Sequence, residues 1–437
     1  MTRPGGTWQN WARTESVRPQ LVEYPTTIEA VRRSVRAAGA RGRALKAVGA
    51  GHSFTGIAAA PGTLLDLSDL SGVVAVDRER GRVRLLAGTR LHRIPALLAP
   101  HRLAMANLGD IDRQTIAGAL STGTHGTGLG HGGLATQVVG ATLVTADGEL
   151  LTVDDENEPD LLPAVALGLG ALGILVDVTL QCVPAFALGA QEQPEPLDAV
   201  VDDLDARVRG VDHFEFYWFP HTTVALTKTN TRMPTDAPTA PLSPLSRMLD
   251  ERIVGNGVHQ LVCSAGRLAP PLVPAINRLS ARVWGDRRFS DASHRVFTTQ
   301  RSVRFREMEY AVPLDELASA FREVRDLVDA SGWRIEFPIE VRVAPADDRW
   351  LSTAYARDSG YIAVHRYWRA DHRAYFAAVE EIMRAHAGRP HWGKLHTLDA
   401  AALRERYPRF DDFLTLRDRL DPTRMFRNAY LDRVLGA

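Results

Sequence analysis

Two opposite charges alternate with apolar residues in the sequence PIEVRV, residues 338–343. Side chains along a β-strand point alternately to its two faces, so Glu340 and Arg342 would share one face of a strand whose other face is apolar. The two charges would then project together from the sheet. On a surface they would form an ion pair of little energetic value, whereas at a cavity they would both face a ligand.

Lysine is rare in this chain. Lys46, Lys228 and Lys394 are the only lysines among 52 basic residues, and the others are arginines. A lysine in such a background is a candidate for chemistry that needs a compact, titratable ammonium group. We single out Lys394, because an ammonium group can hold a substrate hydroxyl oxygen or favour its deprotonation.

Two further runs place polar side chains on common faces. If the sequence HWGKLH is extended, Trp392, Lys394 and His396 share one face, and in residues 361–368 His365 shares a face with Tyr367. A metal site at His365 or His396 is not favoured, because no carboxylate or cysteine ligands accompany these histidines at a usable spacing.

Two segments match the dinucleotide pattern G-x-G-x-x-G, at residues 128–133 and 168–173. That fingerprint needs a strand before it and a helix after it, so that the pyrophosphate meets a helix N-terminus. Both segments here run into predicted strands instead. A nicotinamide site of this kind is therefore not expected.

What remains is a set of glycine-rich loops between strands, which can cradle phosphates through successive backbone N–H groups. The loops are VGAGHSF at residues 48–54, AGALSTGTHGTG at residues 117–128 and a third at residues 170–174. They predict a nucleotide site that does not depend on a helix dipole.

The first half of the chain alternates short helical and strand patterns. Residues 28–38 have the spacing of an amphipathic helix, with Thr26 and Thr27 as candidates for its cap and Gly39 as its end. Asp147 and Gly148 separate two β-rich runs and predict a hairpin. Further strands are expected at residues 44–48, 64–67, 73–76 and 83–86.

The sequence pattern changes after residue 184, where we place a domain boundary. A helical run at residues 198–208 and an aromatic strand at residues 213–219 follow, and four prolines in residues 231–246 predict a loop or lid. Later strands are expected at residues 302–312, 334–343 and 361–368, with helices at residues 314–330 and 372–387 between or after them. The fold class is therefore α+β, without internal repeats.

Composition excludes several classes of protein. The 437 residues are too many for one ordinary core, and the 52 acidic residues balance the 52 basic ones, so nucleic acid is not an expected partner. Cys182 and Cys263 lie in apolar surroundings and predict buried thiols in a reducing compartment. The N-terminus has no signal-peptide pattern, and the longest uncharged apolar stretch, residues 161–176, is shorter than the about 20 residues of a membrane span. A cytoplasmic protein without an integral membrane anchor is expected.

In combination these motifs resemble a known family. The VGAGHSF loop, STGTHGTG and then GALGI before a strand resemble the FAD-binding domain of the vanillyl-alcohol-oxidase superfamily. Three later segments, PIEVR, RPHWGK and the terminal LDPTRMFRN, resemble its aldonolactone oxidase branch, which includes gulonolactone and arabinonolactone oxidases and neighbours the alditol oxidases. The resemblance covers nearly the whole chain, with the motifs in the family's order.

The resemblance implies a division of the chain. It predicts a PCMH-type FAD-binding domain of two α+β subdomains at residues 1–183. A substrate or cap domain with an antiparallel sheet covered by helices would follow at residues 184–391. A C-terminal segment, residues 392–437, would return to the flavin.

The resemblance also implies the cofactor contacts. In the family, the His of the first loop is joined to the flavin 8α-methyl carbon, which corresponds to covalent FAD at His52. His125 is expected to pack beside the flavin and to bond to backbone. The residues expected to bind the cofactor are Val48, Gly49, Ala50, Gly51, His52, Ser53, Phe54, Gly109, Ala117, Gly118, Ser121, Thr122, Gly123, Thr124, His125, Gly126, Gly170, Gly173, Ile174, Lys394 and Asn428.

The same resemblance places the Glu340–Arg342 pair at the flavin, where it would bind substrate hydroxyls and support negative charge near the reduced ring. Lys394 matches a substrate-contact position of the family, and Asp110 is expected to reach substrate. The complete set of expected catalytic residues is Glu340, Arg342, Lys394, Asp110, His396, Tyr367 and His365. The proton acceptor is left open among Glu340, Lys394 and a nearby histidine.

The expected reaction is FAD-dependent oxidation of a sugar-derived alcohol, with hydride transfer to flavin N5. An aldono-1,4-lactone would be oxidised at C2 to an ascorbate-type product, and an alditol at C1 to an aldose. Gly109 leaves room for oxygen, so O2 is the expected acceptor and H2O2 the product. The alternatives are an alditol oxidase, a lactone dehydrogenase with another acceptor, or a flavin-binding sensor or assembly subunit without turnover.

Overall fold

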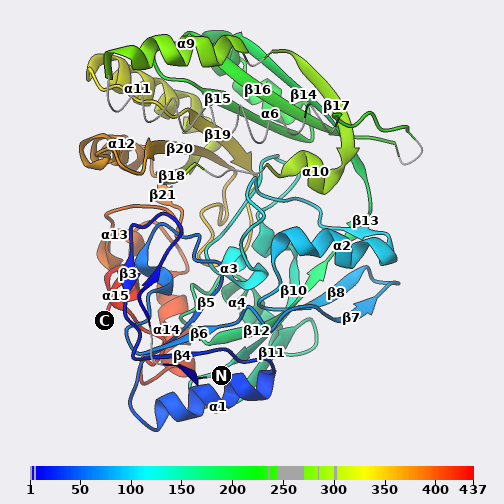
Figure 1. The fold of residues 1–437 in the computed structure, drawn as a ribbon, viewed down its shortest axis with the longest axis vertical. Coiled ribbons are helices and arrows are strands. Elements are labelled where there is room, and N and C mark those ends of the chain that lie inside the picture. The colour runs from blue at the N-terminus through cyan, green and yellow to red at the C-terminus, as the bar shows by residue number, and fades with distance from the viewer. Residues whose placement is uncertain are drawn as a thin grey trace.

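The computed structural model of the chain describes residues 2–3, 6–234, 237–243, 246, 270–283, 285–299 and 303–437. In the view of Figure 1 the molecule has a lower and an upper lobe, and both ends of the chain lie in the lower one. Cys263 lies outside the described residues, and Cys182 is a buried free thiol.

Two sheets build the lower lobe. The first has the strand order β1 (Thr2–Arg3), β4 (Leu21–Glu23), β6 (Thr63–Asp66), β5 (Leu45–Val48), and β6 runs parallel to both of its neighbours. The second is antiparallel, in the order β11 (Leu150–Asp154), β10 (Val138–Val144), β12 (Ile174–Gln181), β8 (Arg82–Leu86), β7 (Val73–Asp77). The strands expected in this half and the hairpin at Asp147 and Gly148 are confirmed within one or two residues.

Short elements connect these strands. They are β2 (Trp8–Gln9), β3 (Ser16–Val17), α2 (Ile94–Leu98), β9 (Leu103–Ala104), α3 (Ile116–Ser121), α4 (Leu162–Val165) and β13 (Val183–Pro184). Helix α3 directly precedes the glycine-rich turn at residues 122–126, which places that turn at the top of the lower lobe in Figure 1.

Helix α1 (Ile28–Gly39) begins where its sequence predicts. The Thr27 hydroxyl accepts a hydrogen bond from the Ala30 amide, which satisfies one of the free donors of the first turn. Val31 and Val35 are completely buried on one side of the helix and pack with Leu65 and Val176 of the two sheets. The apolar face of this helix therefore joins the two sheets into one core.

One antiparallel sheet of eight strands forms the upper lobe. Its order is β17 (Arg287–Ala292), β14 (Ala187–Pro196), β16 (Val224–Arg232), β15 (His213–Trp218), β19 (Ile339–Ala344), β20 (Ser359–Tyr367), β18 (Phe305–Pro313), β21 (Arg389–Pro390). All of its strands come from residues 187–390. Helices α5 (Leu197–Asp202), α6 (Leu204–Arg209), α9 (Val273–Val283), α10 (Ser293–Phe297), α11 (Leu317–Ala330) and α12 (Arg373–Ala385) complete the lobe.

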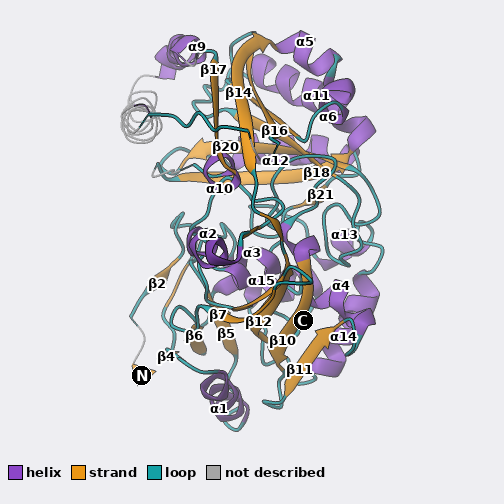
Figure 2. Ribbon diagram, turned by 90° about the vertical axis from the view of Figure 1, so that its right-hand side faces the viewer, coloured by secondary structure: helices purple, strands orange, loops and turns teal. Residues whose placement is uncertain are grey.

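The sheet lies between helices and the lower lobe. Figures 1 and 2 show α9 and α11 above it and the lower lobe beneath it. Ile339, Val341 and Val343 of β19 pack in the same core as Phe321 and Val324 of α11. Glu340 and Arg342 alternate with them and therefore face the lower lobe, as the sequence pattern predicts.

Two boundaries differ from expectation. Residues 334–338 are not a strand, because Pro338 lacks the N–H that a central strand needs, and β19 starts at Ile339. Residues 231–232 belong to β16 and not to a loop, whereas the described residues 233–234, 237–243 lack helix and strand. The division of the chain into domains stays a prediction.

The C-terminal segment carries α13 (Ala400–Arg404), α14 (Phe410–Leu420) and α15 (Ala429–Leu435) and lies against the lower lobe. Asn428 fixes it there: its side-chain N–H groups point to the carbonyls of Gly56, Ile57 and Ala59, at 2.9–3.0 Å. Its carboxamide oxygen accepts from the Leu431 amide and caps α15. Asn428 thus ties the end of the chain to the segment that follows the first glycine-rich loop.

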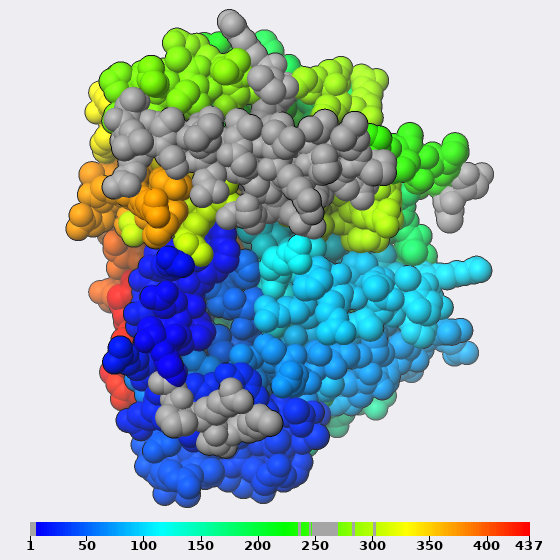
Figure 3. All heavy atoms as spheres, in the orientation of Figure 1, coloured from blue at the N-terminus to red at the C-terminus, as the bar shows by residue number. Residues whose placement is uncertain are grey.

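The N-terminal segment also joins distant parts of the chain. Figure 3 shows the first described residues, in dark blue, on the surface of the lower lobe and reaching the upper one. The Trp11 amide donates to the Gly51 carbonyl at 2.7 Å, and the Trp11 carbonyl accepts from Arg304 at 2.7 Å. Trp11 therefore links the first glycine-rich loop to the start of β18.

In the described part of the chain, no helix has both the length and the apolar character that a membrane crossing requires.

Asn428→Ala should lower the free energy of unfolding by about 2–3 kcal/mol, because three buried carbonyls lose their donor and α15 loses its cap. Chemical denaturation measures this change. Asn157→Ala is the matched control, since the Asn157 side chain bonds to Asp154 at an exposed turn, and it should leave stability nearly unchanged. Equal stability of the Asn428 and Asn157 variants would contradict the anchoring role.

Candidate active site

Two cavities meet between the lobes and share the residues His52, Ser53, Gln114 and Thr122. The first, in the lower lobe, spans about 1040 Å³ including its opening to solvent. The second, between the lower lobe and the β18–β19–β20 face of the upper sheet, spans about 790 Å³, also including its opening. A ligand that enters both would pass His52.

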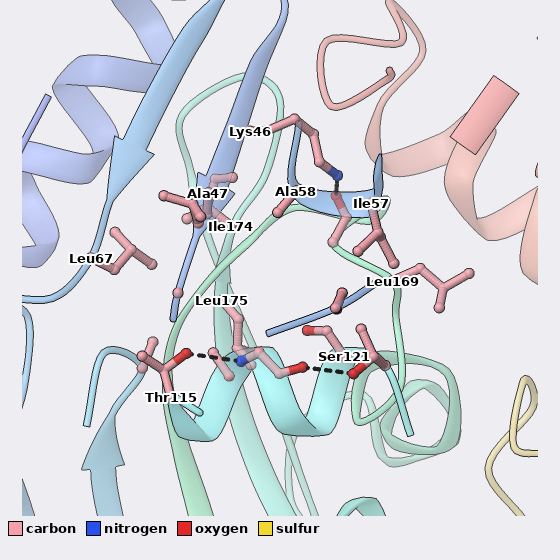
Figure 4. A pocket seen from close by; sticks show the side chains of 18 of the residues that line it. Lys46, Ala47, Ile57, Ala58, Leu67, Thr115, Ser121, Leu169, Ile174 and Leu175 are labelled. Carbon is pink, nitrogen blue, oxygen red and sulfur yellow. Dashed lines mark hydrogen bonds between the residues drawn. The ribbon is translucent and has the colours of Figure 1, made fainter. Parts of the chain in front are cut away.

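The first cavity is built from backbone. It lies between β5, α3 and the turn before β12 (Figure 4), and Gly51 and Gly170 adopt left-handed backbone angles, φ +65° and +60°, that side-chain-bearing residues rarely adopt. The expected cofactor residues that line it are Val48, Gly49, Ala50, Gly51, His52, Ser53, Ala117, Gly118, Ser121, Thr122, Gly170, Gly173 and Ile174.

Other expected cofactor residues lie elsewhere. Phe54, Gly109, Thr124, His125 and Lys394 line the second cavity. Gly123, Gly126 and Asn428 line neither cavity. Gly126 is needed for close packing, since a Cβ there would lie 2.3 Å from the Leu108 carbonyl oxygen.

Lys46 of β5 is a cation that sequence reasoning did not assign to this cavity. Its buried amine donates to the Gly170 carbonyl at 2.7 Å (Figure 4), and no described carboxylate lies within 4.0 Å of it. Burial, with Arg417 adding to the effect, lowers the pKa of Lys46 to about 7. A buried amine without a carboxylate, beside loops that present backbone N–H groups, fits a phosphate-bearing nucleotide.

His52 lies at the junction of the two cavities. Its ring stacks on Trp11 at 5.6 Å. Burial, followed by the nearby charges of Arg90 and Lys394, lowers its pKa to about 4. The imidazole is therefore neutral at pH 7 and keeps one nitrogen lone pair.

One wall of the second cavity carries the arginine cluster, which we define as Glu340, Arg342, Glu215 and Lys228. Arg342 Nε donates to Glu215 at 2.8 Å, and its terminal nitrogen pairs with Glu340. Burial opposes the charge of Arg342, but Glu340 and Glu215 hold its pKa well above the ordinary value. Asp110 lies near this wall on the loop after β9, and its backbone carbonyl accepts from the Thr299 amide at 3.0 Å.

Beside the arginine cluster, on the same face of the sheet, is the lysine cluster, defined as Glu307 and Glu309 of β18 and His365 of β20 with Lys394, His125 and His391 of the neighbouring loops. Lys394 forms an ion pair with Glu307 of β18, and His365 lies 3.5 Å from the same carboxylate. Burial alone would raise the pKa of Glu307, but Lys394 and His365 lower it to about 2. Glu307 is therefore an anion under all ordinary conditions.

Glu309 lies between two histidines. His125 Nε2 is 3.2 Å from its carboxylate, while His125 Nδ1 faces the Gly126 carbonyl at 2.8 Å, so the expected bond of His125 to backbone is present. Burial opposes the charge of Glu309, but His125 and Lys394 keep its pKa well below the ordinary value.

His125, Glu309 and His391 place three ligand-type atoms within 4.8 Å of one another. A metal ion there is disfavoured by the hydrogen bonding of His391. Its Nδ1 accepts from the Gly393 amide at 3.0 Å, so in the neutral ring Nε2 carries the proton and offers no lone pair. The cluster is a hydrogen-bonded group of two histidines around one carboxylate.

The expected common face of HWGKLH is not observed. The Lys394 amide donates to the His391 carbonyl at 3.0 Å and closes a turn, which directs Lys394 into the cavity. Trp392 is fully buried and bonds to the Leu351 carbonyl, and His396 bonds to Tyr430. Neither Trp392 nor His396 lines either of the two cavities. The prediction of a shared face is wrong because the segment is not extended.

His365 and Tyr367 lie two residues apart on β20 and share a face, as expected. His365 lines the second cavity, whereas Tyr367 packs in an aromatic cluster with Phe337 and with Phe54 and Phe305, which line the cavity. Tyr367 therefore supports residues of the wall without lining it.

Several charged residues of the site were missed from the sequence. Glu307 and Glu309 alternate in FREMEYAVP as Glu340 and Arg342 do in PIEVRV, so the same argument would have found them. Glu215, by contrast, lies in an aromatic strand and meets Arg342 only through strand pairing that sequence alone does not give.

Gly109 has a packing role that is independent of any ligand. A Cβ at this position would lie 2.9 Å from the His125 carbonyl oxygen. The absence of a side chain therefore lets the loop at residues 107–111 approach the turn that carries His125.

Comparison with known families matches both halves of the chain. A model described as FAD binding domain matches residues 19–154, and a model described as D-arabinono-1,4-lactone oxidase matches residues 178–434.

Two curated relatives span nearly the whole chain. L-gulono-1,4-lactone dehydrogenase of Mycobacterium tuberculosis is 44% identical, over 98% of this chain and 99% of that protein. L-gulonolactone oxidase of Scyliorhinus torazame is 35% identical, over 98% of each chain.

Among solved structures, cholesterol oxidase from B. sterolicum has a TM-score of 0.83, with 18% identity, over 100% of this chain and 97% of that one. At this identity the likeness concerns the fold alone. The expected α+β fold with a PCMH-type FAD-binding domain is confirmed.

Proposed function

The chain belongs to the D-arabinono-1,4-lactone oxidase family of FAD-linked oxidoreductases, and from this premise we propose that it oxidises an aldono-1,4-lactone of the L-gulono or D-arabinono type at C2. The substrate class comes from the names of the relatives. The product is a keto-lactone that enolises to an ascorbate-type ene-diol.

The charge of the second cavity is the observation that carries this proposal. Four acidic residues, Asp110, Glu307, Glu309 and Glu340, line it beside two basic residues, Arg342 and Lys394. Each of these two cations is paired with a carboxylate. The cavity therefore repels an anionic aldonate and accepts a neutral, polyhydroxylated ring, whose hydroxyls can both donate to carboxylates and accept from cations.

The residues have distinct parts in the reaction. Bound FAD supplies a hydride acceptor, the flavin N5. Lys394, held by Glu307, donates to the oxygen of the reacting hydroxyl and stabilises the negative charge that develops there. Arg342 orients a neighbouring hydroxyl, and Glu340 or His365 accepts the hydroxyl proton.

We propose O2 as the electron acceptor, with H2O2 as product. The support is that one full-length relative is named an oxidase; Gly109 adds none, because a Cβ there would lie 2.9 Å from the His125 carbonyl oxygen. The relatives divide on this point, because one is named a dehydrogenase and another an oxidase. Measuring O2 uptake and H2O2 during lactone oxidation therefore tests this part of the proposal.

The proposal includes a covalent bond between His52 and the 8α-carbon of the flavin. Its support is the position of His52 at the junction of the two cavities and its neutral ring at pH 7. A protonated imidazole would have no lone pair for such a bond.

Flavin fluorescence should survive on a denaturing gel of the purified protein, because a covalent bond withstands unfolding. His52→Ala should abolish the fluorescent band, and free FAD should instead appear in the supernatant after acid precipitation. Ser53→Ala is a matched control at the next residue and should keep the band. A wild-type band without fluorescence would contradict the covalent bond.

Turnover with L-gulono-1,4-lactone should proceed, and the open-chain L-gulonate should fail, because the carboxylate-rich cavity repels the anion. Glu340→Gln should lower kcat/KM by about 100-fold or more, the range of a lost general base. Activity is measured as lactone consumption with O2 uptake and H2O2 in equal amounts.

Other outcomes would redirect the assignment. Oxidation of xylitol but not of the lactone would move the protein to the alditol oxidases. Lactone-dependent reduction of an artificial dye without O2 uptake would make it a dehydrogenase. Flavin that no lactone or polyol reduces would favour a binding subunit without turnover.

A further inference from the structure

Lys228 lies behind the wall of the second cavity. It belongs to β16, is 8% exposed and lines neither of the two large cavities. The other two lysines of the chain, Lys46 and Lys394, each line one of the two large cavities. Lys228 is thus the lysine whose place the proposed function does not yet explain.

Lys228 is connected to the cavity through Glu215. The two residues are direct cross-strand partners of β15 and β16, and Lys228 Nζ lies 3.6 Å from Glu215 Oε1. The second oxygen of Glu215 accepts from Arg342 Nε at 2.8 Å. Arg342 in turn pairs with Glu340 in the cavity wall. The four side chains form a line of alternating charge that crosses three adjacent strands.

Glu215 is an anion in this line. Burial opposes its charge, but Arg342 and Lys228 lower its pKa below the ordinary value. Two buried ions behind a cavity wall are costly to desolvate, and apolar residues of similar size are often at least as stable. Stability alone therefore does not account for the pair.

Lys228 contributes to the charge balance of the wall around Arg342. Without Lys228, the guanidinium of Arg342 would face Glu215, Glu340 and Asp110 alone. Lys228 adds a second cation, whose remaining bond goes to the Val296 carbonyl at 3.2 Å. Other titratable and charged groups also surround the Glu340–Arg342 pair. They come from every element packed against it: Asp110, His125, Glu215, Tyr217, Lys228, Glu307, Glu309, Tyr361, His365, His391 and Lys394.

We propose that Glu215 and Lys228 are positioning residues that set the charge of the Glu340–Arg342 pair, an inference that rests on the proposed function. Glu215 holds Arg342 by Nε, so that its terminal nitrogen faces Glu340. Lys228 neutralises Glu215, so that Glu340 remains ionised and able to take part in the removal of the substrate proton.

The proposal predicts opposite effects for the two residues. Glu215→Gln removes a negative charge, makes Glu340 easier to ionise and should move the acidic limb of the pH profile to lower pH. Lys228→Met removes a positive charge and should move it to higher pH. Each shift is expected to be about one pH unit. The double variant should return close to wild type, because the two charge changes cancel.

The experiment is the rate of anaerobic flavin reduction at low lactone concentration, measured against pH in the FAD-loaded enzyme. Lys228→Arg keeps the charge and should retain the wild-type profile. Asp177→Asn is the matched control: Asp177 is 1% exposed, pairs with Arg84 in the lower lobe and lines neither large cavity, so this variant should leave the profile unmoved.

A second readout does not need turnover. Ionisation of Glu340 beside the flavin should appear as a pH-dependent change in the visible absorption of the resting enzyme, absent in Glu340→Gln. This titration should shift in the same two directions. If lactones fail to reduce wild-type flavin but the titration shifts as described, the proposed function fails and the positioning role stands.

Two results would overturn the inference. The first is a pH shift of the same sign in Glu215→Gln and Lys228→Met. The second is a pair of unshifted titrations together with a lower free energy of unfolding. Either result would mean that the pair only stabilises the sheet. If Glu215→Gln does not fold, the pH profiles of Lys228→Met and Lys228→Arg test the proposal on their own. A Lys228→Met profile that is not shifted would also overturn the proposal.

Discussion

Four glutamates of the upper sheet, Glu215, Glu307, Glu309 and Glu340, are buried around a single cavity. Removing such charges from water costs several kcal/mol for each ion unless a well-placed partner compensates it. The compensating groups are Arg342, which lies on the same strand as Glu340 and on a neighbouring strand to Glu215, and groups of the loops around Lys394 and His125. The charge balance of the site therefore depends on the register of β15, β16 and β19 and on the turn at residues 391–394.

This constraint also explains how the two lobes cooperate. The lower lobe supplies backbone, with glycine-rich loops and one buried lysine, which suits a cofactor with phosphates. The upper sheet supplies side chains of both charges, which suit a neutral substrate with many hydroxyls. His52 and its neighbours belong to both cavities, so the two ligands must meet there.

Local sequence patterns predicted the parts of the fold that local physics determines. The cap and apolar stripe of α1, the hairpin at Asp147 and Gly148 and the alternation in β19 all depend on residues close in sequence. The turn at Lys394 was missed, because the conformation of the HWGKLH segment depends on its tertiary contacts and not on its local sequence pattern. Lys228 and Glu215 were missed for the same reason: their meeting with Arg342 depends on the order of three strands from distant parts of the chain.

The central claim is that this cavity removes hydrogen from C2 of a neutral aldonolactone. Its most direct test is anaerobic reduction of the enzyme-bound flavin by L-gulono-1,4-lactone with deuterium at C2, compared with the unlabelled lactone in single-turnover experiments. The account predicts rapid bleaching by both substrates, with a clearly slower rate for the deuterated one. Bleaching at the same rate under conditions where chemistry limits the reaction, or none at all, would contradict it.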